Sequence, residues 1–183
     1  QPDSSYDVDR TDRAVAAWRN SLTEPLSLAG ALAERSMVLR RTGNSAEANL
    51  SLEEAMEVTK SLLDLGDCTS LPNAMREAAE EQLGEGRADL AAGWFERAYQ
   101  HDRRLEAGWE ERALLTASAW AEACEESDDL ARAAYVRSEA AGLASELITT
   151  RPDLKNSLEE FVLDSSTRAA DNVASSKIAD AGE

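Results

Sequence analysis

Two stretches of the chain, residues 43–55 (GNSAEANLSLEEA) and 86–98 (GRADLAAGWFERA), are copies of one pattern. In each copy a small residue, a large apolar residue and a second small residue follow a glycine at offsets of five, nine and twelve positions. Residues spaced by four and three positions lie on one face of an α-helix. Both stretches therefore predict a helix that begins after a glycine turn and packs closely on a neighbouring helix. The residues of this face are Ala48, Leu52 and Ala55 in the first copy and Ala91, Phe95 and Ala98 in the second.

A third, degenerate copy occupies residues 128–140 (DDLARAAYVRSEA). Asp128 replaces the glycine, Ala133 and Ala140 keep the small positions, and Arg137 stands at the large one. The copies begin 43 and 42 residues apart. Recurrence at this period is typical of stacked helical hairpins, in which each unit buries its apolar face against the next.

The rest of the chain extends this pattern to an all-α protein of about eight helices. Alanine dominates the apolar residues, aromatic residues are 5 %, and no stretch alternates apolar and polar β-branched residues as a strand would. We expect a polar N-terminal lead over 1–9, a repeat domain over 10–150, and a C-terminal capping helix with a polar tail over 151–183. Helical periodicity predicts helices over 9–22, 26–41, 46–65, 72–83, 87–102, 104–125, 130–148 and 154–164.

The small-large-small pattern resembles the second helix of the tetratricopeptide repeat family. The first-helix signature of that family is weak here, because only its small position is kept, as Ser36 and Ala79. The 42- to 43-residue spacing is also longer than the family's 34 and closer to that of other α-solenoids. The resemblance implies a TPR-like α-solenoid with antiparallel hairpins. A plain helical bundle is the alternative.

The resemblance further implies that the first helices of the hairpins line a concave, partner-binding face. Within that face, Asn73, Arg76 and Arg40 would form a small basic cluster able to hold a carboxylate, as family members hold peptide termini. The alternative is that these arginines only balance nearby glutamates on the surface. The candidate partner-binding residues are Met37, Arg40, Arg41, Asn73, Arg76, Glu80, Ser118 and Glu122.

Charge restricts the possible partners. The formal net charge is −17, and all three thirds of the chain are acidic. Such a surface repels nucleic acid and anionic membranes, so we expect a protein partner, and one with a basic patch would suit it. No run of 18 apolar residues predicts a membrane-spanning helix.

The sequence contains none of the common catalytic, metal-binding or phosphate-binding motifs. Its single histidine, His101, is predicted near a helix end, and Cys68 and Cys124 belong to no C-x-x-C pair. No Glu-x-x-His pair, phosphate loop or calcium loop occurs. We therefore expect no cofactor, no metal and no catalysis. Trp94 and Phe95 are adjacent and cannot share one helix face, so one of them should meet another helix or a partner.

These observations favour a non-catalytic scaffold, adaptor or accessory subunit that binds a partner protein. The alternative is a structural subunit of a larger cell-envelope complex that uses hairpin edges and no peptide groove. Gln1 with its polar lead resembles the new N-terminus that cleavage of an export signal leaves, so we expect an exported, periplasmic or extracellular location, with a cytoplasmic one as the alternative.

Overall fold

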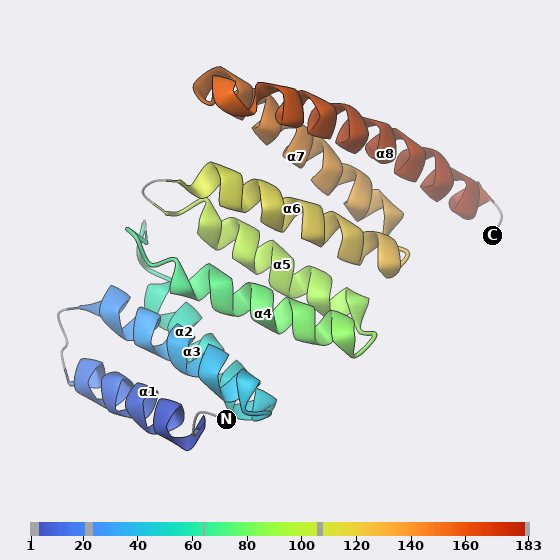
Figure 1. Cartoon of the computed structure of the whole chain (residues 1–183). Helices are drawn as coiled ribbons and strands as arrows, with labels where there is room; N and C mark the ends of the chain where they lie inside the picture. Colours follow the sequence, from blue (N-terminus) through green and yellow to red (C-terminus); the bar gives the residue numbers. More distant parts are fainter. Residues whose placement is uncertain (1–3, 21–23, 64, 106–107, 182–183) are drawn as a thin grey trace.

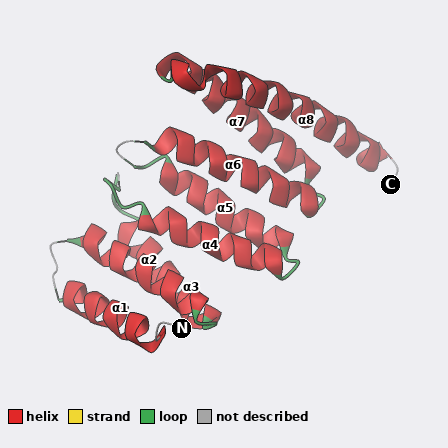
Figure 2. Cartoon of the chain, viewed as in Figure 1, coloured by secondary structure: helices red, strands yellow, loops and turns green. Residues whose placement is uncertain are grey.

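The protein folds into a stack of helices, seen in a computed structural model that describes residues 4–20, 24–63, 65–105 and 108–181. No strand occurs in that part of the chain, as Figure 2 shows. The predicted all-α class is therefore confirmed. The elements are α1 (Ser4–Arg19), α2 (Pro25–Arg41), α3 (Ser45–Thr59), α4 (Ser70–Gly84), α5 (Ala88–Asp102), α6 (Trp109–Glu126), α7 (Leu130–Thr150), a 3-10 turn η1 (Pro152–Leu154) and α8 (Lys155–Ala181).

Neighbouring helices pack in the order of the chain (Figure 1). Helix α1 packs on α2, α2 on α3 and α4, and each helix from α4 to α7 packs on the next. The stack begins with α1 and ends with α8, so the two termini lie at opposite ends (Figure 1). Helices α3 and α5 both pack on α4 but are not a closely packed pair with each other.

The three repeat turns have the same backbone geometry. Gly43, Gly86 and Asp128 adopt left-handed conformations, with φ of 81°, 72° and 59°. In each turn the next residue donates its N–H to the carbonyl five residues earlier, at 2.9 Å: Asn44 to Leu39, Arg87 to Gln82, and Asp129 to Cys124. This is the Schellman arrangement that ends a helix. The degenerate third copy is therefore a true structural repeat, with aspartate in a position that favours glycine.

The pattern residues lie where the repeat predicts. All six small positions are fully buried alanines, and Leu52, Phe95 and Arg137 fill the large positions with at most 2 % of each exposed. Two apolar clusters result, one from α1 to α5 with Leu105 and one from α4 to α8. Trp94 and Trp109 contact both clusters and join them into one core.

Both ends of the chain are more helical than predicted. Helix α1 begins at Ser4, inside the expected polar lead, and buries Thr11 and Val15 against the stack. Helix α8 continues to Ala181 and does not end near residue 164. Its polar second half is tied to α6 because Arg168 and Asn172 both bond Glu125. These helical segments were not predicted because they are mostly polar, and each buries only a narrow apolar stripe.

Two predicted boundaries inside the stack were also wrong. The helix expected over 46–65 ends at Thr59, and the one expected over 104–125 begins at Trp109. Gly108 has a φ of 66°, which an α-helix cannot continue through. The two linkers bond each other instead: the Leu65 N–H donates to the Arg104 carbonyl at 2.8 Å.

Candidate functional site

The residues predicted on the first helices tie α2 to α4. Arg40 forms an ion pair with Glu81 and donates to Asn49 Oδ1 at 2.8 Å, while Arg41 pairs with Glu77 at 2.6 Å. Met37 is half-buried against the first apolar cluster. Arg40 is therefore bound to an internal carboxylate and lies in a different set of contacts from Asn73 and Arg76.

Asn73 and Arg76 do come together, within a larger network centred on Asp102. Arg76 donates to Asn73 Oδ1, to Asp102 Oδ2 at 2.6 Å and to Thr116 Oγ1 at 2.8 Å. Arg112 reaches the same group from α6, donating to Asn73 Oδ1 at 2.8 Å. Its Nε lies 3.5 Å from Asp102 Oδ1, an ion pair without hydrogen-bond geometry. This Asp102 network joins α4, the end of α5 and α6.

The electrostatics of the Asp102 network are those of a buried charge cluster. The Asp102 side chain is 0 % exposed, and two half-buried guanidinium groups face it. Burial lowers the pKa of Arg76 below its usual value, and the positive charge of Arg112 lowers it further, while Asp102 opposes both. The single Asp102 carboxylate thus neutralises both Arg76 and Arg112, and the charges of the network are balanced among its own residues.

The remaining predicted residues lie apart from that network. Glu80 and Glu122 are exposed, and Glu122 lies 3.9 Å from the buried Arg137. Ser118 is half-buried on α6. A partner-binding role for the predicted residues stays a prediction. Sequence inspection missed Asp102, Thr116 and Arg112, because only folding brings the end of α5 and the face of α6 against α4.

A groove lies instead between two second helices, α3 and α5. It consists of two hollows of about 330 and 440 Å³ that follow one another along these helices. We call it the α3–α5 groove. Its residues on the α3 side are Asn49, Glu53, Met56, Glu57 and Lys60. Those on the α5 side are Asp89, Leu90, Gly93, Trp94, Arg97, His101 and Arg104, and Gln82 and Arg87 line the end nearest the α4–α5 turn.

The floor of the α3–α5 groove is apolar and open. Trp94 is half-buried, packs against both apolar clusters, and carries the Arg97 guanidinium 4.7 Å from its ring centre. Leu90 is exposed, and a Cβ atom built on Gly93 would meet nothing within 4 Å. Of the adjacent pair, Phe95 therefore fills the core and Trp94 faces the groove. The sequence signal for this site is a glycine in mid-helix beside a tryptophan.

The walls of the α3–α5 groove carry charges of both signs. Glu53 on α3 and Arg97 on α5 form no ion pair with a described residue. His101 Nδ1 lies 2.8 Å from the Arg97 carbonyl oxygen, and burial lowers the pKa of this histidine. The imidazole is therefore mainly neutral at pH 7. Arg97, Glu53 and Asp89, which also lines the groove and forms no ion pair with a described residue, are charges that a partner could meet.

No group of three or more His, Cys, Asp or Glu side chains in residues 4–20, 24–63, 65–105 and 108–181 is placed to hold a metal ion. Over the same ranges, none of the helices has the length and apolar character needed to cross a membrane. Comparison of the chain with protein-family models, with curated proteins and with solved structures finds no match.

Proposed function

We propose that this protein is a non-catalytic, TPR-like scaffold or adaptor that binds a partner protein. The observation that carries the proposal is the α3–α5 groove, whose floor offers Trp94 and the open space above Gly93. Partly exposed aromatic rings beside open hollows are typical anchors of protein interfaces, because they bury a large apolar area at low entropic cost.

The dimensions of the groove suit an amphipathic segment of the partner. Between Asn49 and Lys60 it runs about 17 Å along α3, at a rise of about 1.5 Å per residue. Leu90, Trp94 and Met56 would receive apolar side chains at helical spacing. Arg97 and Glu53, both without an ion pair to a described residue, would fix the direction of the segment.

The residues predicted on the first helices then have a supporting role. Arg40 bonds Asn49, which lines the groove, and Glu81 on α4. The Asp102 network holds α4, α5 and α6 together. These ties keep α3 and α5 at the separation that leaves the groove open.

The test fills the hollow above Gly93. Gly93→Trp should abolish capture of the partner from an extract of the source organism, because the new ring occupies space that the partner needs. Gly142→Trp on α7 is the matched control, since its Cβ also meets nothing within 4 Å. Gly93→Ala should keep binding. Equal capture by wild type and both tryptophan variants, all shown folded by circular dichroism, would refute the groove.

A second candidate function is that of a structural subunit in a larger envelope assembly. Exposed apolar side chains favour it, because Tyr135, Leu163 and Val173 are exposed on α7 and α8. Val173 also lines a shallow hollow of about 480 Å³ between these two helices. Native mass spectrometry of the protein from its source, with cell fractionation, tests this function and the exported location. A monomer in the soluble cytoplasmic fraction would contradict both.

A further inference from the structure

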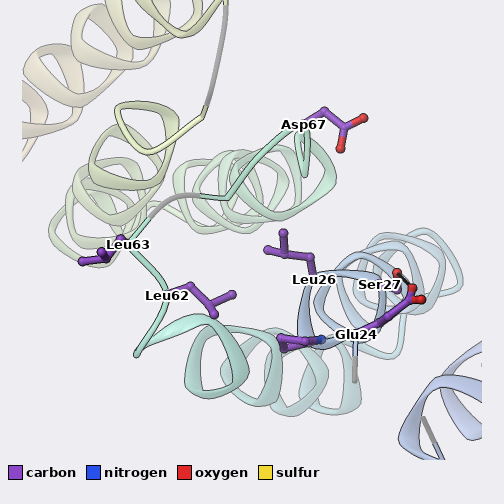
Figure 3. A pocket seen from close by; sticks show the side chains of 7 residues that line it. Glu24, Leu26, Ser27, Leu62, Leu63 and Asp67 are labelled. Carbon is purple, nitrogen blue, oxygen red and sulfur yellow. Dashed lines mark hydrogen bonds between the residues drawn. The ribbon is translucent and has the colours of Figure 1, made fainter. Parts of the chain in front are cut away.

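A separate pocket lies where the start of α2 meets the α3–α4 linker (Figure 3). Its volume is about 540 Å³. Leu26 and Leu62 stand on facing walls, and Leu63 and Asp67 lie further along the linker (Figure 3). We call this the Leu26 pocket. Its residues are Glu24, Pro25, Leu26, Ser27, Leu62, Leu63 and Asp67.

The linker that forms one wall is held in place on both sides of the pocket. Arg104 donates to the carbonyls of Thr59, at 2.9 Å, and Leu62. Leu65 is fully buried, and its N–H donates to the Arg104 carbonyl at 2.8 Å. The conformation of the segment around Leu62 is therefore set by Arg104 on the other linker.

This held segment exposes a leucine. Leu63 is 97 % exposed, the most of the large apolar side chains in the described part of the chain. Single exposed apolar residues are common on soluble proteins. Leu63 differs because it lines the same pocket as Leu26, Leu62 and Pro25.

The rim of the Leu26 pocket is acidic. Glu24 and Asp67 are exposed, and Glu24 Oε2 accepts a hydrogen bond from Ser27 at 3.0 Å. Neither carboxylate forms an ion pair with a described residue. Both therefore present uncompensated negative charge beside an apolar surface, in a chain whose net charge is −17.

We propose that the Leu26 pocket binds a segment of a partner protein in which a leucine-like side chain adjoins a lysine or arginine. The apolar side chain would enter between Leu26, Leu62 and Leu63, and the cation would lie between Glu24 and Asp67. Charge complementarity selects this occupant, since an acidic segment would be repelled by the same rim. The Leu26 pocket shares no lining residue with the α3–α5 groove.

The test uses short, capped synthetic peptides as probes and the leucine methyl NMR signals of the full chain as readout. A peptide containing Leu-Lys should shift the signals of Leu26, Leu62 and Leu63, with a Kd on the order of 1 mM for one buried anchor and one charge pair. Peptides containing Leu-Glu or Ser-Lys should bind at least about five times more weakly.

Variants identify the groups that recognise the peptide. Glu24→Gln with Asp67→Asn should weaken Leu-Lys binding by about fivefold and remove its salt dependence. Glu34→Gln is the matched control, because Glu34 is an exposed carboxylate on α2 outside the pocket. Leu63→Ser should weaken binding while the other two leucine signals still report it.

Three outcomes would overturn the proposal. Equal binding of the Leu-Lys and Leu-Glu peptides would show that the rim charges do not select the occupant. Methyl shifts confined to leucines outside the pocket would place the peptide elsewhere. An uncharged detergent micelle serves as a third probe, and methyl shifts as large as those with the Leu-Lys peptide would indicate a lipid-like occupant. Gly93→Trp should leave peptide binding unchanged.

Discussion

Arg137 and Glu125 form a two-point contact inside the third hairpin, with Nε and Nη2 of the arginine each 3.3 Å from one carboxylate oxygen. The arginine side chain is 2 % exposed. The same carboxylate accepts from Arg168 and Asn172 on α8. An ion pair has thus replaced the leucine or phenylalanine of the other repeats, and it joins α6, α7 and α8.

Removing the carboxylate should cost more than removing the arginine. Glu125→Gln leaves the buried Arg137 guanidinium with only the exposed Glu122 carboxylate, 3.9 Å away, as counter-charge, and we expect a loss of about 2–3 kcal/mol in the free energy of unfolding. Arg137→Leu restores the apolar residue of the repeat and leaves Glu125 with Arg168, so we expect a change within about 1 kcal/mol. Urea unfolding measures both, and the reverse order would contradict this account.

The pH dependence of stability should follow Glu125. Burial alone would raise the pKa of Glu125, but bonds from Arg137 and Asn172 and the charges of Arg137 and Arg168 outweigh it and lower the pKa. A lowered pKa in the folded state adds stability above the unfolded pKa, ordinarily 4.5, and this is lost as pH falls through the folded value. The stability difference between wild type and Glu125→Gln should therefore be constant near pH 7 and shrink below about pH 4.

Loss of a carboxylate charge should destabilise the protein more at the Asp102 network than at the exposed Arg19–Glu54 ion pair. Asp102→Asn keeps the shape of the side chain but leaves Arg76 and Arg112 facing a neutral amide, with an expected loss of about 3 kcal/mol. Glu54→Gln is the control, because its pair with Arg19 is exposed at 54 % and 39 %, and we expect less than about 1 kcal/mol. Equal losses of unfolding free energy for the two variants in chemical denaturation would show that burial of the ion pair does not determine the effect.

The three turns predict opposite effects for exchanging glycine and aspartate. Asp128→Gly should stabilise the protein by about 0.5–1 kcal/mol, because the left-handed conformation strains a residue with a Cβ atom. Gly86→Asp should destabilise it by a similar amount. Thermal unfolding of the two variants checks the signs, and shifts of Tm in the same direction would be inconsistent with a shared turn geometry.

The two cysteines should differ in reactivity. Burial raises the pKa of Cys124 to about 11, so its thiolate is scarce and shielded at pH 8. Cys68 is half-buried in the α3–α4 linker. Iodoacetamide should add one label to the native protein and two in urea, by mass spectrometry. In Cys68→Ser, native labelling should disappear; persistence of the label would place the reactive thiol at Cys124.

The helices and the repeat could be predicted because they depend on local patterns. Gly43 and Gly86 indicate turns because glycine readily adopts the positive φ that these turns require, and the spacing of the alanines indicates the buried helix face. The sequence also indicated that Asp128 replaces a turn glycine. The ends of the chain were harder, since the helical part of 165–181 depends on Glu125, which lies far away in the sequence.

The candidate site was predictable only in part. Asn73 and Arg76 were expected together from the register of the repeat, and they do bond, three positions apart on α4. The buried Asp102 that neutralises Arg76 was not expected, because its position depends on how α5 packs between α4 and α6. The α3–α5 groove was not predicted, because it lies between two second helices. Its width depends on how α3 and α5 each pack on α4, which the sequence pattern does not give.

The sequential packing of the stack has a consequence for how the chain folds and opens. From α4 to α8 each helix packs chiefly on the helices next to it in the chain. Most contacts there therefore join residues that are close in sequence, so this part of the fold has a low contact order. Such topologies fold rapidly, and their stability adds up unit by unit along the array. Unfolding then starts at the ends. Helix α8 packs chiefly on α7 and bonds α6 through Glu125, so its loss leaves α3, α4 and α5 assembled.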